Sequence, residues 1–533
     1  MGRLSLVILT IASFFGSTLA QNDTPIKIWI VNSAPVDLLL SVNPLFESGK
    51  YIWTSDLDEA DLALDYEQQA GVVTTRWLYV PVVPFAHTAE QVRWEDVRRY
   101  WAGDLAALSY LTPTRTPPEL VVSSETLRAL VSVLGNPAVN VPFHYAETTD
   151  AIPELLWNTR PNGWGVMSFS QLTPILKVLT LDRFDVFGDG FDLEAYPLTT
   201  YINLKGDDAK LGLAIEDLLK LGSWQPSNRN PEQLSRVVLT GVTALTRATA
   251  AEMEERGITV PAEGILPFLS DSDLLHTSNE VSFSENCGYP DRYGGVIFCS
   301  RDSYLGLLTY IGLDVVELTG NHINDYGAGA FRRTLDIYDQ NGIATFGGGR
   351  TVEDARDAYI TTIKGTSIAF IGCNVAGPFG AWASEYQEGA ARCDDAYLEQ
   401  EIPRLAQTVD IVILTFQEYE QYTYTPPAAQ VRNFEKYAAL GADVVIGSQA
   451  HQPQGFTFSN GAFLHHGLGN LFFDQMQNIY TRQMFADKLI LYDGRLINVV
   501  LFTGLIEDFC CPRPMTAAER ETFLTTIFQA SGW

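Results

Sequence analysis

The chain has little positive charge for its size. Its 533 residues carry 35 Lys and Arg against 64 Asp and Glu, a formal net charge of −29. Nucleic acids and acidic membrane faces are bound through clustered positive charge, so neither is expected as a partner of the whole surface. An anionic ligand can bind only in a local cationic pocket or through a metal ion.

Cysteine is also scarce, and the first half of the chain has none. All six cysteines lie between residues 287 and 511, and none has the C-x-x-C spacing of a zinc site. An even number of cysteines in an exported protein favours disulfides. Proximity along the chain predicts two bridges, Cys287–Cys299 and Cys373–Cys393.

Long apolar runs are absent after the first 20 residues. Arg3 precedes the apolar run Leu4–Phe15 and a small-residue end at 17–20, the pattern of a signal peptide cleaved after Ala20. An uncleaved anchor is the alternative, but the run is shorter than the ~20 residues that span a bilayer. We therefore expect a secreted or extracytoplasmic protein without a stable transmembrane segment after cleavage, either free or associated with the cell surface.

The two halves of the remaining chain differ in character. The chain is too long for one typical core, so at least two domains are expected. Residues 21–230 hold no cluster of His, Asp and Asn, and the stretch 223–232, rich in Pro, Asn and Ser, is typical of a linker. The sequence thus predicts a signal peptide over 1–20, domains over 21–230 and 236–510, and a C-terminal tail over 511–533.

The second half is a run of strand–loop–helix units whose strands end in polar loops. Leu313–Leu318 is strand-like and precedes Asn321, His322 and Asp325; a helical pattern follows, ending at Asn341-Gly342, and a second strand covers Ile343–Phe346. Polar groups just beyond parallel strands lie where ligands bind in α/β folds. Asn and His at this place suit a metal ion or an oxyanion.

The first half contains segments such as YVPVVPFAHTAEQVRWEDVRRYWAGD and AYPLTTYINL. These resemble extracytoplasmic solute-binding proteins of the phosphate-binding type, which implies a two-lobed α/β domain. The Ser/Thr-Gly anion loop of true phosphate binders is not evident, so the resemblance leaves the ligand open.

Five motifs occur in order in the second half: GNHINDYG, GGGRTVEDA, TPPAAQ, GADVVIGSQAHQPQG and GLGNLFFD. Together they resemble the CapA family of capsule and poly-γ-glutamate synthesis proteins, whose domain is similar to the calcineurin-like metallophosphoesterases. The resemblance covers residues 236–505. It implies a four-layer αββα sandwich with a site at the strand ends, and an α/β class for the whole chain.

The resemblance also implies roles for individual residues. Sites of this kind hold one or two divalent metals that polarise a phosphoryl oxygen and lower the pKa of a bound water. Asn321 and His322 match the family's Asn-His pair, and His451 matches the second His of a later loop. The implied residues are His322, Asn321 and Asp325 for catalysis, Glu280, Asn321 and His451 for metal, and Arg350, Gln417, Gln449 and Asn279 for binding.

Three presumed metal ligands of the family are replaced in this chain. Val242 stands where the first metal-binding Asp is expected, and Gln417 and Gln449 stand where His is expected. Val offers no donor atom and Gln only a neutral one, so a tightly held metal pair is not expected. The alternatives are one divalent ion (Mn, Fe or Zn) in a reshaped site, aided by Glu418 or Glu420, and no metal.

The Gly347–Gly349 triplet and Arg350, which follows it, can each be interpreted in two ways. The triplet could bind an anion through backbone N–H groups, or form a tight strand-to-helix turn before Thr351. Arg350 could receive a carboxylate or phosphate, or form a surface ion pair.

Three hypotheses about function follow from the two resemblances. In the first, the protein takes part in making, exporting or handling an anionic surface polymer such as poly-γ-glutamate or capsule, alongside the synthesis machinery, with a degenerate metal site. In the second, it is an active metal-dependent hydrolase of phosphoesters or of an amide-linked polymer. In the third, it is an extracytoplasmic sensor whose first half captures a small anion.

Overall fold

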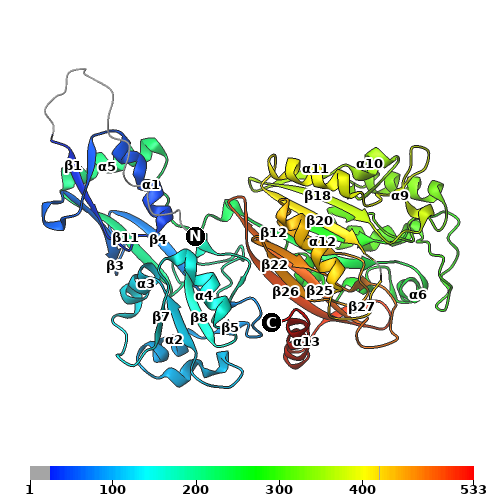
Figure 1. Cartoon of the computed structure of the whole chain (residues 1–533), viewed down its shortest axis with the longest axis horizontal. Helices are drawn as coiled ribbons and strands as arrows, with labels where there is room; N and C mark the ends of the chain where they lie inside the picture. The colour runs from blue at the N-terminus through cyan, green and yellow to red at the C-terminus, as the bar shows by residue number, and fades with distance from the viewer. Residues whose placement is uncertain (1–23, 419) are drawn as a thin grey trace, which may run out of the picture. The chain divides into compact units, whose positions relative to one another are not determined.

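A computed structural model describes residues 24–418 and 420–533 of the chain (Figure 1). The predicted signal peptide lies outside the described residues. The chain divides into two compact units, one made of residues up to 75 with 201–226 and the other of residues 76–200 with 227–533. Within the described part of the chain, no helix is both long and apolar enough to cross a bilayer.

The first unit is a small α/β body formed by two separate chain segments. Its central strand β1 (Ile26–Ile30) alternates buried and half-buried residues and pairs in parallel with β2 (Tyr51–Thr54) and β3 (Leu62–Glu67). Strand β11 (Thr199–Gly206) returns antiparallel to β3. Helices α1 (Val36–Glu47) and α5 (Asp208–Leu221) pack against each other.

The second unit begins with a mixed sheet. Strand β4 (Val73–Pro84) pairs antiparallel with β8 (Gly163–Ser168), and β8 is parallel to β6 (Glu119–Val122). The other elements of this part are β5 (Gln91–Val92), β7 (Phe143–Tyr145), β9 (Leu176–Val178), β10 (Thr180–Leu181), α2 (Trp94–Trp101), α3 (Ser124–Leu134) and α4 (Ile152–Asn158).

The remainder of the second unit is built on two large sheets. The first has the order β15-β14-β13-β12-β25-β26-β27, with β24 beside β12, and the second has the order β17-β18-β20-β21-β23-β22. Their strands are β12 (Leu234–Thr243), β13 (Leu274–Asn279), β14 (Val315–Glu317), β15 (Ala344–Phe346), β17 (Tyr359–Ile363), β18 (Thr366–Asn374), β20 (Ile411–Gln417), β21 (Val444–Gly447), β22 (Phe456–Ser459), β23 (Ala462–His465), β24 (Asn470–Phe472), β25 (Gln483–Tyr492), β26 (Arg495–Glu507) and β27 (Cys511–Pro514).

The two sheets pack face to face through one apolar core, to which Leu239, Phe346, Ile413 and Phe485 belong. Helices cover both outer faces: α9 (Ala328–Gln340) packs on the first sheet and α12 (Ala428–Ala439) on the second. The predicted four-layer αββα sandwich is therefore present. The sandwich helices are α6 (Arg247–Arg256), α7 (Leu266–Leu269), α8 (Leu305–Tyr310), α9 (Ala328–Gln340), α10 (Val352–Arg356), α11 (Asp395–Ala406), α12 (Ala428–Ala439) and α13 (Ala517–Ala530).

The burial patterns of individual strands and helices explain why they form. Every residue of β20 is buried, as expected for a strand with sheet and helix layers on its two sides. Helix α9 buries Phe331, Leu335 and Tyr338 at helical spacing, and Gly342 follows it with φ +70°, a left-handed conformation suited to glycine. The helix and the strand β15 after it confirm the elements predicted from the sequence.

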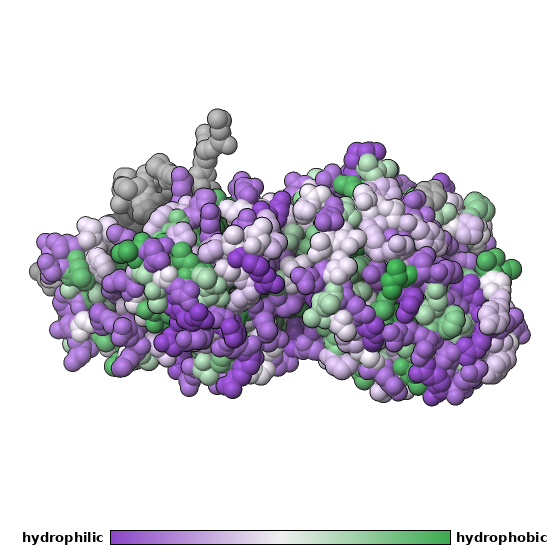
Figure 2. Space-filling model, turned by 90° about the horizontal axis from the view of Figure 1, so that it is seen from below, coloured by the Kyte–Doolittle hydropathy of each residue, from purple (hydrophilic) through white to green (hydrophobic). Residues whose placement is uncertain are grey.

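All six cysteines form disulfides. The pairs Cys287–Cys299 and Cys373–Cys393 confirm the prediction from proximity, and Cys510 pairs with its neighbour Cys511. The first bridge closes the loop that carries Phe298, and the second ties the end of β18 to the segment before α11. Hydrophilic side chains predominate on the face shown in Figure 2, with hydrophobic residues in small scattered groups.

Candidate functional site

The candidate site lies where parallel strands of the two sheets end. Glu280 follows β13, His322 follows β14, Glu420 follows β20 and His451 follows β21. Strands β12, β13 and β14 are mutually parallel, as are β18, β20 and β21, so each sheet presents its carboxyl ends at one edge. This topology gathers residues that lie up to about 170 positions apart along the chain, as 451 − 280 shows.

His322 is oriented by Asp325. Its Nδ1 lies 2.7 Å from Asp325 Oδ2, which also accepts a hydrogen bond from the Phe298 amide at 2.8 Å. Because a carboxylate only accepts, Nδ1 carries the proton and Nε2 faces Glu280 Oε1 at 3.8 Å. Burial alone would lower the pKa of His322, but the hydrogen bond to Asp325 raises it above the ordinary value.

His451 is oriented in the same way from the other sheet. Its Nδ1 lies 2.7 Å from Asn470 Oδ1, whose amide nitrogen donates to backbone carbonyls, and its Nε2 lies 3.4 Å from Glu420 Oε1. Burial opposes the charged imidazole, yet the hydrogen bond to Glu420 and the charge of Glu420 raise the pKa of His451. The same hydrogen bond and charge lower the pKa of Glu420 to about 2, so the two residues form an ion pair.

Glu280 lies within reach of both imidazoles. Its side chain is 1% exposed, and its Oε2 atom has no hydrogen-bond partner among the described residues. Burial raises the pKa of Glu280, and the charges of His451 and His322 only partly offset this effect. A buried carboxyl that favours its uncharged form beside two imidazoles that favour their charged form is an arrangement suited to proton transfer.

A clamped arginine completes the cationic side of the site. Arg247, the first residue of α6, bonds both oxygens of Asp474, through Nε at 3.1 Å and a terminal nitrogen at 2.5 Å. Its guanidinium carbon lies 4.6 Å from the ring centre of Phe298 and 4.9 Å from that of Phe473. Two aromatic faces and a bidentate carboxylate therefore fix the charge in place.

The two aromatic rings link the two histidines. The ring of Phe298 lies 4.2 Å from that of His322, the ring of Phe473 lies 5.3 Å from that of His451, and the two Phe rings are 6.1 Å apart. This continuous series of ring contacts brings His322 and His451 to one place. The convergence of the two histidines is the geometry on which the sequence interpretation depended.

The position expected to hold the first metal-binding Asp is apolar. Val242 is fully buried in a cluster with Ala244, Val281, Phe298 and Phe473. Across the described residues, no three His, Cys, Asp or Glu side chains are placed to hold a metal ion together. The donor set therefore does not fit a two-metal centre, and no step of the chemistry is assigned to one.

The other predicted site residues make mainly structural contacts. The Asn279 amide donates to Tyr338 Oη at 2.5 Å, Gln417 accepts from Asn374 at 2.9 Å, and Gln449 donates to Ser278 at 3.2 Å. Each of these three side chains is at most 3% exposed. Asn321 precedes His322 directly and buries an Oδ1 atom that lacks a partner among the described residues.

The Gly347–Gly349 segment packs too closely against its neighbours for side chains. A Cβ on Gly348 would lie 2.7 Å from the Leu318 carbonyl oxygen, and one on Gly349 would lie 2.4 Å from the Ala355 nitrogen. Close packing thus accounts for these glycines. Arg350, which follows, is 45% exposed and pairs with Asp336 at 2.7 Å, and no contact found in the described part of the chain joins it to His322 or His451.

Sequence reasoning missed Arg247, Phe298, Asn470, Phe473 and Asp474. The last three lie in the GLGNLFFD motif, and Arg247 lies five residues after Val242, the position where the resemblance expects a metal-binding Asp. Both regions were therefore marked in the sequence. No local pattern distinguishes Phe298, because its role comes from the Cys287–Cys299 loop that delivers it.

Comparisons with known proteins show what the second half of the chain is similar to. Residues 236–475 match the family model described as "Bacterial capsule synthesis protein PGA_cap". A "Capsule biosynthesis protein CapA" of Bacillus anthracis is 22% identical over 260 residues, which is 48% of this chain and 63% of that protein. A "PGA biosynthesis protein CapA" of Bacillus subtilis (strain 168) is 22% identical over 225 residues, 42% of this chain and 59% of that protein.

The chain therefore spans about three fifths of the length of these two curated relatives. A solved phosphate transport receptor of the ABC type from Vibrio cholerae is 14% identical with a TM-score of 0.30, over 37% of this chain and 93% of the receptor. A likeness at that score says nothing about ligand or activity.

Proposed function

We propose that this chain makes, exports or handles an anionic surface polymer outside the cytoplasm, because residues 236–475 match the model of the bacterial capsule synthesis protein family. We propose further that it does so by holding acidic groups of the polymer, and that poly-γ-glutamate, named for one matched relative as PGA, is the first candidate. The synthesis machinery of that polymer is the expected partner.

The observation that carries this proposal is the convergence of three cationic groups on one aromatic pair. Arg247 lies over Phe298 and Phe473, and the rings of His322 and His451 contact the same two phenyl groups. A guanidinium carries five N–H donors, of which Asp474 takes two, so Arg247 can hold a second carboxylate, and a raised imidazole pKa adds positive charge near neutral pH.

Neighbouring acids hold these cations in position for a ligand. Asp474, Asp325 and Glu420 each orient one cation, whereas Glu280 favours its uncharged form and so opposes a bound carboxylate less. The side chains of Arg247 and His322 are each 20% exposed, so both remain open to a ligand that approaches the strand ends. Acidic side groups of a polymer can then bind here without metal.

The direct test is binding of fluorescently labelled poly-γ-glutamate oligomers to the mature chain, measured by anisotropy. Arg247→Met and His322→Gln should each weaken binding at least about tenfold, the loss of roughly 1.4 kcal/mol from a charged hydrogen bond. Arg332→Met is the matched control, because Arg332 is 60% exposed and pairs with Glu388. Equal affinity of all four proteins would contradict the proposal.

A second candidate function is hydrolysis of an amide-linked polymer by acid–base chemistry. The raised pKa of Glu280 beside His322 favours it, since a neutral carboxyl can donate a proton to a leaving group. Size-exclusion chromatography of poly-γ-glutamate after incubation with wild type and Glu280→Gln separates the two functions. Shortening of the polymer by wild type but not by Glu280→Gln would support hydrolysis. An unchanged polymer length would contradict hydrolysis and favour binding.

A further inference from the structure

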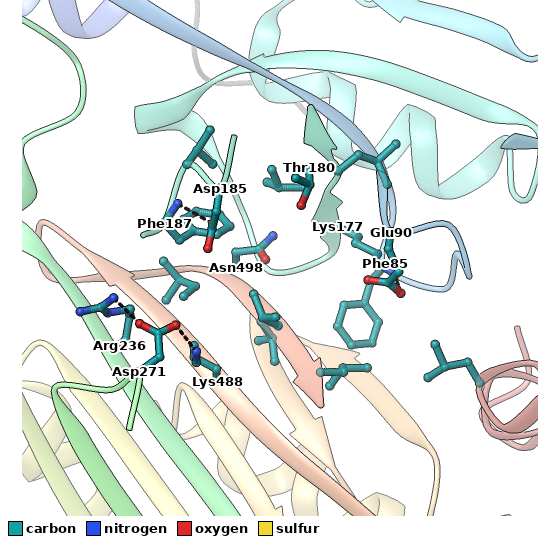
Figure 3. Close-up of a pocket in the computed structure, with 18 of the residues that line it drawn as sticks. Phe85, Glu90, Lys177, Thr180, Asp185, Phe187, Arg236, Asp271, Lys488 and Asn498 are labelled. Carbon is teal, nitrogen blue, oxygen red and sulfur yellow. Dashed lines mark hydrogen bonds and ion pairs between the residues drawn. The ribbon is translucent and has the colours of Figure 1, made fainter. Parts of the chain in front are cut away.

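The second unit contains a cavity lined by both its 76–200 part and its sandwich (Figure 3). The cavity has a volume of about 130 Å³. Strand β9 contributes Lys177, strand β26 contributes Asn498 to Leu501, and helix α13 contributes Arg520, Leu524 and Phe528. None of the strand-end residues around His322 and His451 lines it.

One end of the cavity carries two cations that share one carboxylate. Glu90 Oε1 accepts hydrogen bonds from Lys177 Nζ at 2.5 Å and from Arg520 at 2.9 and 3.0 Å. Lys177 and Arg520 are only 14% and 18% exposed, so water screens their charges poorly. Two positive groups and one negative group leave this end with a surplus charge of +1.

The opposite end carries no surplus positive charge, and Asp185, which also lines the cavity, adds a carboxylate. Asp271 bridges Arg236 at 2.6 Å and Lys488 at 2.6 Å, and Arg236 also pairs with Asp189 and Asp273. Figure 3 shows the Arg236–Asp271–Lys488 group apart from Lys177, Glu90 and Phe85. An added anion would therefore be favoured at the Lys177 end, where burial lowers the pKa of the lysine to about 8 and Arg520 adds to the effect.

The wall beside these cations is apolar. Phe85, Leu501, Leu524 and Phe528 line the cavity and belong to or pack against the core between the sheets. A cavity of about 150 Å³ with such a lining accommodates a benzene ring. The volume here, about 130 Å³, suits an apolar body no larger than a benzene ring, and a charged group attached to that body would lie at the partly exposed Lys177 and Arg520 side chains.

We propose that this cavity binds a small apolar monocarboxylic acid of the size of phenylacetate. Its carboxylate pairs with Lys177 and Arg520 and supplies the missing negative charge, and its apolar body lies among Phe85, Leu524 and Phe528. Because the lining comes from both chain segments, the bound acid joins the 76–200 part to the sandwich. The proposal does not depend on the function assigned to the strand-end site.

Calorimetric titration of the full mature chain with phenylacetate tests this inference. We expect saturable one-to-one binding and a rise in melting temperature, because a ligand of the folded state stabilises it. Phenylacetamide, which has nearly the same shape but no charge, should bind at least about tenfold more weakly, as should phenylacetate to Lys177→Met. Lys436→Met is the matched control, since Lys436 pairs with Asp395 and Glu399 on a distant helix layer.

A cavity-filling variant, Leu501→Trp, tests whether phenylacetate binds in the cavity without removing a charged side chain. It should abolish phenylacetate binding while poly-γ-glutamate binding at the strand-end site persists. Absence of phenylacetate binding to wild type, equal binding of phenylacetamide, or retained binding by Leu501→Trp would each overturn the proposal.

Discussion

Replacing Glu420 by Gln removes the carboxylate that pairs with His451. The pKa of Glu420 falls from 4.5 to about 2 in the folded protein, which is equivalent to roughly 3 kcal/mol if fully realised. The Glu420 side chain is 44% exposed, so solvent screening reduces this contribution to about 1 kcal/mol. We expect Glu420→Gln to lower the free energy of unfolding by that amount near pH 5.5.

The loss of unfolding free energy caused by Glu420→Gln should depend on pH. A lowered carboxyl pKa stabilises the fold above 4.5, and this contribution is lost as the pH falls through about 2. The raised pKa of His451 stabilises the fold below 6.5, and this contribution is lost as the pH rises through the folded value. The destabilisation is therefore largest between about 4.5 and 6.5 and shrinks at alkaline pH.

Urea unfolding of wild type and variant at pH 5.5 and pH 9, with the disulfides intact, measures this difference. Glu385→Gln is the matched control, because Glu385 is exposed and lies on the loop after Trp382. A cost that is equal at the two pH values, or no larger than that of the control, would refute the reasoning about the His451–Glu420 pair.

Four further predictions concern the sandwich. Replacing Cys373 and Cys393 by Ser opens a loop of 20 residues and should cost about 3 kcal/mol of stability, measured by urea unfolding. Val242→Asp places a lone carboxylate in a dry apolar cluster, so its melting temperature should drop by several degrees; an unchanged value would mean that water reaches the cluster. Asp487→Asn breaks a fully buried pair with His465 and should cost about 3 kcal/mol, more than replacing both partners by Leu. Mass spectrometry of the purified protein should find well under one equivalent of Mn, Fe or Zn; a full equivalent lost in a His451→Ala variant would contradict this.

The individual strands and helices of the sandwich could be predicted because their signals are local, whereas the four-layer arrangement was implied by the family resemblance. Strand-like runs that end in polar loops recur along residues 313–470, and α9 has a complete apolar face with a glycine stop. Parallel strands place their carboxyl ends at one edge of a sheet. Histidines that follow such strands, like His322 and His451, are therefore candidate site residues.

The charge state of the site could not be predicted in the same way. It depends on distances between segments far apart in sequence, such as that from Glu280 to His322 and that from Arg247 to Asp474. Likewise, no pattern in residues 76–200 showed that Lys177 meets Arg520 at one carboxylate. Burial and pairing of this kind exist only once the sheets have packed.

Asn279 shows how a motif position can serve the fold. The resemblance placed it in the site, yet its amide bonds to Tyr338 on α9 and to the Val281 carbonyl. An amide at a strand end satisfies backbone groups of the following loop as readily as it binds a ligand. Sequence position alone does not separate the two uses.

The most direct measurement is NMR titration of the His322 and His451 imidazoles in wild type and in Glu420→Gln. Glu420 contacts His451 but acts on His322 only through space, and its charge raises the pKa of both. If the two histidines share one site, the variant lowers both pKa values, with the larger fall at His451. An unchanged titration of His322 would contradict the shared site.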